Sequence, residues 1–143
     1  MTDRTEFLAG ERPEDVACFL HEDRVSNLDA LDDHAEGVPN GVVLVLPGEK
    51  GRSAFQSVAG IDPMALAQRA MDTPGEIEDD LTGGVCPARG DDPEAEHTVQ
   101  FVFAFVEAQN EEVGGLYAEG DVIHAYAVCA CGETYSEKWL AES

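Results

Sequence analysis

Basic residues are scarce in this sequence. Lysine and arginine together number 8, against 30 aspartates and glutamates, which gives the 143-residue chain a formal net charge of −22 at pH 7. Only two of the basic residues, Lys50 and Lys138, are lysines. Direct binding to a nucleic acid requires cations that neutralise its phosphates. We therefore expect no nucleic-acid partner.

Long apolar segments are also missing. No apolar run approaches the roughly 18 residues that a membrane-spanning helix needs, so we expect no membrane partner. The first residues, MTDRTEFLAGERPED, lack the apolar core of a signal peptide, which predicts a cytoplasmic protein. In that reducing compartment the four cysteines are expected to be metal ligands or inert thiols, not disulfides.

The acidic residues are distributed along the whole chain, and no block of five or six like charges forms an interaction tail. This pattern is typical of a solvated surface. The Debye length is about 8 Å at 0.15 M salt and about 3 Å at 1 M, so molar salt removes most of the self-repulsion of such a surface. The composition favours a halophilic cytosolic protein. An ordinary acidic mesophilic protein is the alternative.

Hydrophobic patterns predict several short elements in the first half. Residues 13–21 are expected to form a helix, because a proline and two acids open a segment with an apolar face. Residues 27–34 are expected to add one or two helical turns. The continuous apolar run 42–46 predicts a strand buried on both faces. Helices are expected over 51–59 and, capped by an aspartate followed by proline, over 62–71.

The second half contains a different pattern. An acidic segment rich in glycine and proline, 76–96, is expected to be a loop. Strands are expected over 98–107, where a helix is the alternative, and over 121–129 and 134–140, in an antiparallel meander. The predicted fold is therefore a single α+β domain, residues 1–143. It consists of an α/β-like half over 1–75, the acidic loop over 76–96, and a β meander over 97–143 packed on the first half.

Cys129 and Cys131 form the sharpest local feature. In a regular strand, residues i and i+2 share a face, so both thiols can point the same way, and Gly132 allows a sharp turn behind them. Cys86 supplies a third sulfur. Because zinc in a structural site takes four nitrogen or sulfur ligands, these cysteines are candidates for a zinc site that needs one more ligand. The alternatives are that they are small thiols buried in a β core, or that Cys129 and Cys131 form a redox pair.

Two histidines can complete the candidate site. His97 is favoured, because it lies on the same loop as Cys86, whereas His124 is expected to face the other side of its strand. The segment CPARG that begins at Cys86 resembles the C-P-x-C-G knuckle of zinc ribbons, with Arg89 where the second cysteine belongs. That departure excludes a four-cysteine site of the zinc-ribbon type.

A second candidate site follows the buried strand. The segment PGEKGRS contains Gly48, Lys50, Gly51, Arg52 and Ser53 between the predicted strand and the next helix. A glycine-rich turn of this kind can present backbone N–H groups to a phosphate. It does not contain the Walker A motif. Anion binding here competes with the simpler interpretation of an ordinary strand-to-helix turn.

The segments TEFLAGERPEDV, GVVLVLPGEKGRSAFQ and EEVGGLYAEGDVIHAYAVCACG resemble a group of small acidic proteins of halophilic archaea, defined as a domain of unknown function. The resemblance covers nearly the whole chain and agrees with its charge, but it implies no activity and no site residue. Two functional classes therefore stay open. The first, which we favour, is a non-enzymatic binding or adaptor module with a protein partner and a structural zinc. The second is a small enzyme or binding protein for a phosphorylated ligand or nucleotide at residues 48–53.

The charge yields the first testable prediction. Lowering the salt concentration to about 10 mM extends the Debye length to about 30 Å, so the acidic groups repel one another across the whole molecule. We expect a cooperative loss of structure on dialysis at pH 7, measured by circular dichroism. Mild acidification is expected to restore part of the signal, because protonated carboxyls no longer repel. A spectrum that stays native in low salt would contradict the prediction.

Overall fold

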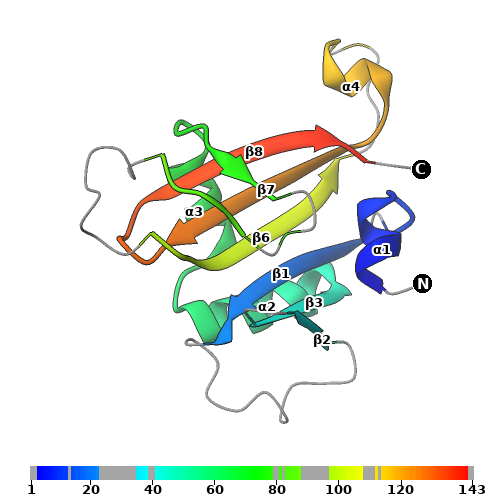
Figure 1. Ribbon diagram of the computed structural model, residues 1–143. Helices are drawn as coiled ribbons and strands as arrows, with labels where there is room; N and C mark the ends of the chain where they lie inside the picture. Colours follow the sequence, from blue (N-terminus) through cyan, green and yellow to red (C-terminus); the bar gives the residue numbers. More distant parts are fainter. Residues whose placement is uncertain are drawn as a thin grey trace.

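Six strands form one antiparallel sheet in the order β2–β3–β1–β6–β7–β8, which is the framework of the computed structural model (Figure 1). A hairpin of two short strands, β4 and β5, forms a separate small sheet. The structure describes residues 3–12, 14–22, 35–38, 41–78, 81, 83–87, 97–107, 112 and 114–141. The strands are β1 (Asp15–His21), β2 (Ala35–Val38), β3 (Gly41–Pro47), β4 (Glu76–Ile77), β5 (Gly84–Val85), β6 (Val99–Glu107), β7 (Val122–Cys129) and β8 (Thr134–Leu140).

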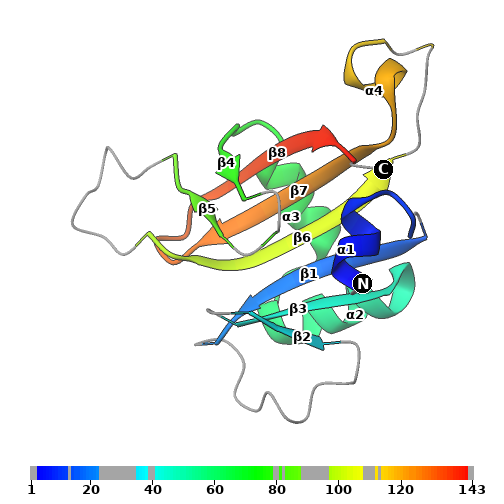
Figure 2. The ribbon, with the colours of Figure 1, turned by 45° about the vertical axis from the view of Figure 1, so that its right-hand side comes forward.

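Two helices, α2 (Gly48–Ala59) and α3 (Pro63–Ala70), cover one face of the sheet (Figure 2). Phe55 of α2 contacts two phenylalanines of β6, with ring centroids 5.9 Å from Phe101 and 5.4 Å from Phe103. We call the buried residues between these helices and the sheet the helix-side core. They are Val16, Cys18, Leu20, Val42, Leu44, Phe55, Leu66, Ala70, Phe101 and Phe103.

The opposite face of the sheet is covered by the short helix α1 (Asp3–Leu8) and by the β4–β5 hairpin. Phe7 and Leu81, both fully buried, are the large side chains that these two segments contribute. A further single turn, α4 (Leu116–Glu119), lies between β6 and β7. The buried residues on this face form the hairpin-side core: Phe7, Ala17, Phe19, Val43, Val45, Ile77, Leu81, Cys86, Val99, Val102, Ala104, Ile123, Ala125, Ala127, Cys129 and Tyr135.

The expectation of a helix over residues 13–21 is wrong, because β1 occupies this segment. Its alternate residues are buried on opposite faces of the sheet: Cys18 lies in the helix-side core and Phe19 in the hairpin-side core. β1 pairs with β3 on one side and β6 on the other. The proline and acids before it are local helix signals. They are outweighed by two strand pairings and by burial on both faces.

Other predicted elements are found near their expected positions. The apolar run 42–46 is the central part of β3, and the two helices after it are α2 and α3, although α2 begins three residues earlier than expected. Asp62 caps α3, and its carboxylate accepts a hydrogen bond from the Met64 N–H at 2.9 Å. The expected helical turns over 27–34 lie outside the described residues. Within the described part of the chain, no helix is long and apolar enough to cross a membrane.

The fold class is α+β, as predicted, and β6, β7 and β8 form the expected meander. The two halves of the chain meet edge to edge: β1 of the first half pairs with β6 of the second over five residue pairs, from Val16 with Phe105 to Leu20 with Phe101. They therefore share one continuous sheet. The segment expected to be an acidic loop includes the β4–β5 hairpin, and its residues 79–80, 82 and 88–96 lie outside the described residues.

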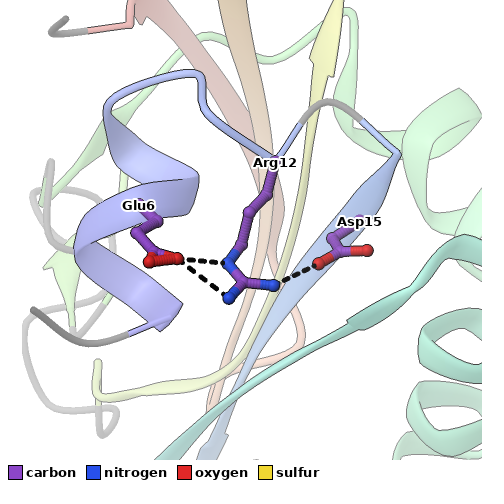
Figure 3. Close-up of polar contacts among 3 residues, drawn as sticks. All are labelled: Glu6, Arg12 and Asp15. Carbon is purple, nitrogen blue, oxygen red and sulfur yellow. Dashed lines mark hydrogen bonds and ion pairs between the residues drawn. The ribbon is translucent and has the colours of Figure 1, made fainter.

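Arg12 connects α1 to the start of β1 (Figure 3). Its Nε and Nη2 atoms lie 3.1 and 2.9 Å from Oε1 of Glu6, and its Nη1 atom lies 3.1 Å from Oδ2 of Asp15. The side chains are partly exposed, so each ion pair contributes at most about 1 kcal/mol. The contact mainly orients α1 over the hairpin-side core, where Phe7 is buried.

The close packing of α2 on β1 yields the second prediction. A methyl group on Gly51 would collide with Cγ2 of the buried Val16. We expect Gly51→Ala to lower the free energy of unfolding by about 1–3 kcal/mol through overpacking, although alanine normally stabilises a helix interior by about 1 kcal/mol relative to glycine. Urea denaturation measures the change, with the exposed Ser57→Ala in the same helix as the control. An increase in the stability of Gly51→Ala would contradict the predicted collision with Val16.

Candidate metal centre

Cys86, His97, Cys129 and Cys131 lie together at one end of the meander. Each offers one ligand atom, and these atoms all lie within 4.8 Å of one another. Sγ of Cys86 is 3.7 Å from Sγ of Cys131, and Sγ of Cys129 is 3.8 Å from Nδ1 of His97. Sulfurs that share one zinc ion at about 2.3 Å in a tetrahedron are about 4 Å apart. The spacing of these four groups is therefore close to that of a coordination shell.

The turn between β7 and β8 positions two of the cysteines. Cys129 is the last residue of β7, and Cys131 follows in the turn. Gly132 has a φ of 95°, and its N–H donates to the Cys129 carbonyl at 2.9 Å. The Cys129 N–H donates in turn to the Glu133 carbonyl at 2.9 Å. The chain thus folds around Cys131 as the glycine predicted, with Cys131 beyond the end of the strand.

The other two residues approach from a different part of the chain. Cys86 follows β5 directly, and His97 lies two residues before β6. The Ala130 N–H donates to the Thr98 carbonyl at 2.9 Å, which holds the start of β6 beside the β7–β8 turn. The segment after β5, the segment before β6 and the β7–β8 turn therefore meet at this point.

Burial distinguishes the four residues. Cys86 and Cys129 belong to the hairpin-side core, where they are 3% and 2% exposed, His97 is half-buried, and Cys131 is exposed. The group therefore lies at the edge of the core, with its inner side closed by apolar packing. Such a position is suited to a structural ion that fixes a loop to a sheet.

The environment affects the thiols unequally. Burial raises the pKa of the Cys129 thiol to about 12. Burial acts in the same direction on Cys131, but a hydrogen bond from the Glu133 backbone and contacts with Cys129, Cys86 and His97 outweigh it, so the pKa of Cys131 is lowered. A bound cation would reverse the effect at Cys129, because a coordinating thiol is deprotonated.

The donor set determines which ions the group can hold. Three sulfurs and one imidazole nitrogen are soft or borderline ligands, which suit zinc, whereas calcium and magnesium require oxygen ligands. The four described donors are enough to fill a tetrahedral shell. The arrangement is therefore chemically capable of binding a zinc-like ion, and it offers little to a hard cation.

Residues 35–142 match the model of a family of unknown function, DUF5807. The chain belongs to this family. The match includes Cys86, His97, Cys129 and Cys131 as well as the whole meander. No curated protein and no solved structure matches the chain.

Of the sequence-predicted site residues, His124 lies elsewhere. It is on the helix side of β7, where its ring stacks on Phe105 with centroids 5.1 Å apart. Among the described residues, His97 is therefore the histidine that lies beside the three cysteines, and it falls within the residues that match DUF5807. The structure brings together the three cysteines and the histidine that the sequence favoured.

The candidate anion-binding residues Gly48, Lys50, Gly51, Arg52 and Ser53 all lie in the first part of α2, not in a turn before it. The Gly48 N–H donates to the Glu14 carbonyl at 3.2 Å, so this amide is already hydrogen-bonded. Gly51 is buried against β1. Its small size is explained by this packing, and anion binding by these residues stays a prediction.

Tyr135 is a residue that sequence reasoning missed. It is fully buried in β8, its ring lies against Gly75, and its hydroxyl faces Gly84 of β5. The hydroxyl has no hydrogen-bond partner among the described residues. Burial, followed by the charges of Cys129, Cys86 and Cys131, raises the pKa of Tyr135, so the hydroxyl keeps its proton beside the three sulfurs. Only the pairing of β7 with β8 reveals this proximity.

The unpartnered hydroxyl yields the third prediction. A buried polar group without a hydrogen bond costs about 1–3 kcal/mol, and Tyr135→Phe removes that group while keeping the ring. In the presence of a metal chelator we therefore expect Tyr135→Phe to raise the free energy of unfolding by about 1 kcal/mol. Urea denaturation in high salt measures it. A fall in stability with chelator present would show that the hydroxyl has a partner in the metal-free protein.

Proposed function

We propose that Cys86, His97, Cys129 and Cys131 bind one Zn²⁺ ion, and that this ion is structural. The observation that carries the proposal is the meeting of four zinc-type ligand atoms within 4.8 Å of one another, contributed by three separate segments. Without a metal, three thiols and an imidazole gain little stability from such a cluster. A shared metal ion accounts for the convergence of these four residues at the β7–β8 end of the meander.

A structural role is favoured over a catalytic one by the number and burial of the ligands. Catalytic zinc sites keep one position for water or substrate, whereas structural sites are closed by four protein ligands. Here four protein ligands are available, and two of the sulfurs are buried in the hairpin-side core. The ion would attach the segment after β5 to the β7–β8 turn, and so fix the hairpin over the sheet.

The hydroxyl of Tyr135 supports the proposal. Ligands of a metal are commonly oriented by hydrogen bonds from a second layer of residues. Three thiolates on one Zn²⁺ ion leave a net negative charge, and a buried protonated hydroxyl beside them is a suitable donor to sulfur. The same hydroxyl has no hydrogen-bond partner among the described residues.

The wider function that we infer is a non-enzymatic binding or adaptor module of a halophilic cytosol, with a protein as partner. Zinc that only stabilises the fold, and an acidic surface that keeps the protein dispersed in high salt, are both consistent with such a module. The test of zinc binding does not depend on which protein is the partner.

The fourth prediction concerns the metal content of the purified protein, which elemental analysis measures. We expect one zinc per chain, and we expect Cys86→Ser to lower zinc affinity by more than about a hundredfold, since loss of a second-layer residue alone costs about 10–100-fold. Cys18→Ala is the matched control, because Cys18 is a buried cysteine of the helix-side core. It is expected to retain the full zinc content.

Stability gives an independent measurement of the same site. Structural zinc contributes several kcal/mol or more, so removal by a chelator is expected to lower the melting temperature by more than about 10 °C. Cys86→Ser is expected to melt at the temperature of the chelated protein, whether or not zinc is added. A protein that carries no metal and is insensitive to chelators would refute the proposal. Stoichiometric iron would keep the site but refute zinc.

A further inference from the structure

A second candidate site lies on the opposite face of the meander from the metal centre. It is a cavity of about 440 Å³, within the range of small-molecule pockets. Its floor is built by two cross-strand pairs of β7 and β8: His124 lies opposite Lys138, and Tyr126 lies opposite Ser136. Because the side chains of a strand alternate between faces, these four share the helix side of the sheet.

The wall of the cavity comes from the segment that follows α3. Met71, Pro74 and Gly75 line it, and Met71 is 64% exposed. Two backbone hydrogen bonds attach this segment to β8: the Gly75 N–H donates to the Ser136 carbonyl at 3.0 Å, and the Ser136 N–H donates to the Thr73 carbonyl at 2.9 Å. The wall and the floor are thus held together by main-chain contacts, so the cavity exists before any ligand binds.

Aromatic rings dominate the inner side of the floor. Phe105 of β6 stacks on His124 with an interplanar angle of 22°, and on Tyr126 with centroids 6.0 Å apart and an angle of 28°. The rings of these three residues are nearly parallel and lie side by side on two strands. Aromatic rings favour offset stacking, so the aromatic ring of a ligand can stack on this group. Burial lowers the pKa of His124, so its ring is neutral near pH 7.

The charge at the cavity differs from that of the chain as a whole. Lys138 is the one lysine or arginine among the described lining residues, in a chain of net charge −22. Glu137 also lines the cavity, but its carboxylate accepts a hydrogen bond from the Ile77 N–H on the opposite face of the sheet. Glu107 lies on the β6 side of His124, with its carboxylate 3.8 Å from Nε2. A negative group on a ligand is therefore expected on the β8 side, at Lys138.

We propose that this cavity binds a small planar aromatic ligand that carries a negatively charged group. The ring lies against His124 and Tyr126, whose rings stack on Phe105, and the charged group pairs with Lys138. The proposal is independent of the zinc site, because it uses none of the metal ligands.

The test uses two probes of this class, AMP and 2-naphthoate, added to the zinc-containing protein and followed by backbone amide resonances. We expect both to shift the amides of His124, Tyr126 and Lys138. Adenosine and inorganic phosphate are used to test the aromatic part and the charged part of AMP separately. Adenosine is expected to shift the same amides more weakly, and phosphate alone is expected to shift none.

Lys138→Gln is the decisive variant, and Arg69→Gln is its matched control, because Arg69 is an exposed basic residue of α3 that does not line the cavity. We expect Lys138→Gln to weaken AMP binding by about tenfold or more while adenosine binding stays within about twofold. Arg69→Gln is expected to bind AMP like the natural chain. Both side chains are exposed, so neither variant is expected to unfold the protein.

Three outcomes would overturn the proposal. The first is the absence of any shift with both aromatic probes. The second is a set of shifts that maps to another part of the molecule, which would include the start of α2. The third is an equal loss of AMP affinity in Lys138→Gln and Arg69→Gln, because this would indicate attraction by overall charge.

Discussion

The pairing of β1 with β6 is the contact on which the rest of the structure depends. It joins two halves that are distant in sequence, and it places β1 in the middle of a six-stranded sheet. With neighbours on both edges, β1 satisfies its backbone groups and buries alternate side chains in the two cores. A segment that did not extend as a strand here would leave the facing N–H and C=O groups of β3 and β6 without partners. Both candidate sites are built on the meander that begins at β6.

The difference between β1 and the meander explains what could be predicted from the sequence. β3 is a continuous apolar run bounded by turn residues, and this local pattern was sufficient to identify it, whereas the phenylalanine-rich segment of β6 favoured a strand with a helix as the alternative. Asp15–His21 follows a proline and an acid, which are local helix signals, and its strand conformation depends on partners that lie about 25 and 85 residues further along the chain. The order of the strands also depends on long-range pairing. The joining of the two halves in one sheet could therefore not be predicted from local patterns.

The same distinction applies to the candidate sites. Cysteine and histidine are rare and their chemistry is specific, so Cys86, His97, Cys129 and Cys131 could be grouped from their types, their spacing and a shared loop. Tyr135 and Lys138 carry no such signal, since a tyrosine or lysine in a strand is ordinary. Their relation to the thiols and to His124 becomes visible only when the register of β7 and β8 is known. Sequence spacing thus finds ligands that are intrinsically unusual and misses residues whose role comes from position.

Register also links the two faces of the meander. On β7 the hairpin side carries Ala127 and Cys129, and the helix side carries His124 and Tyr126. A shift of one residue in a strand moves every side chain to the other face. The same β7–β8 register that opposes Ala127 to Tyr135, beside the thiols, therefore opposes His124 to Lys138 across the cavity floor. An ion held by Cys129 and Cys131 would fix the turn between these strands. It would thereby stabilise the pocket on the far side of the sheet without contacting it.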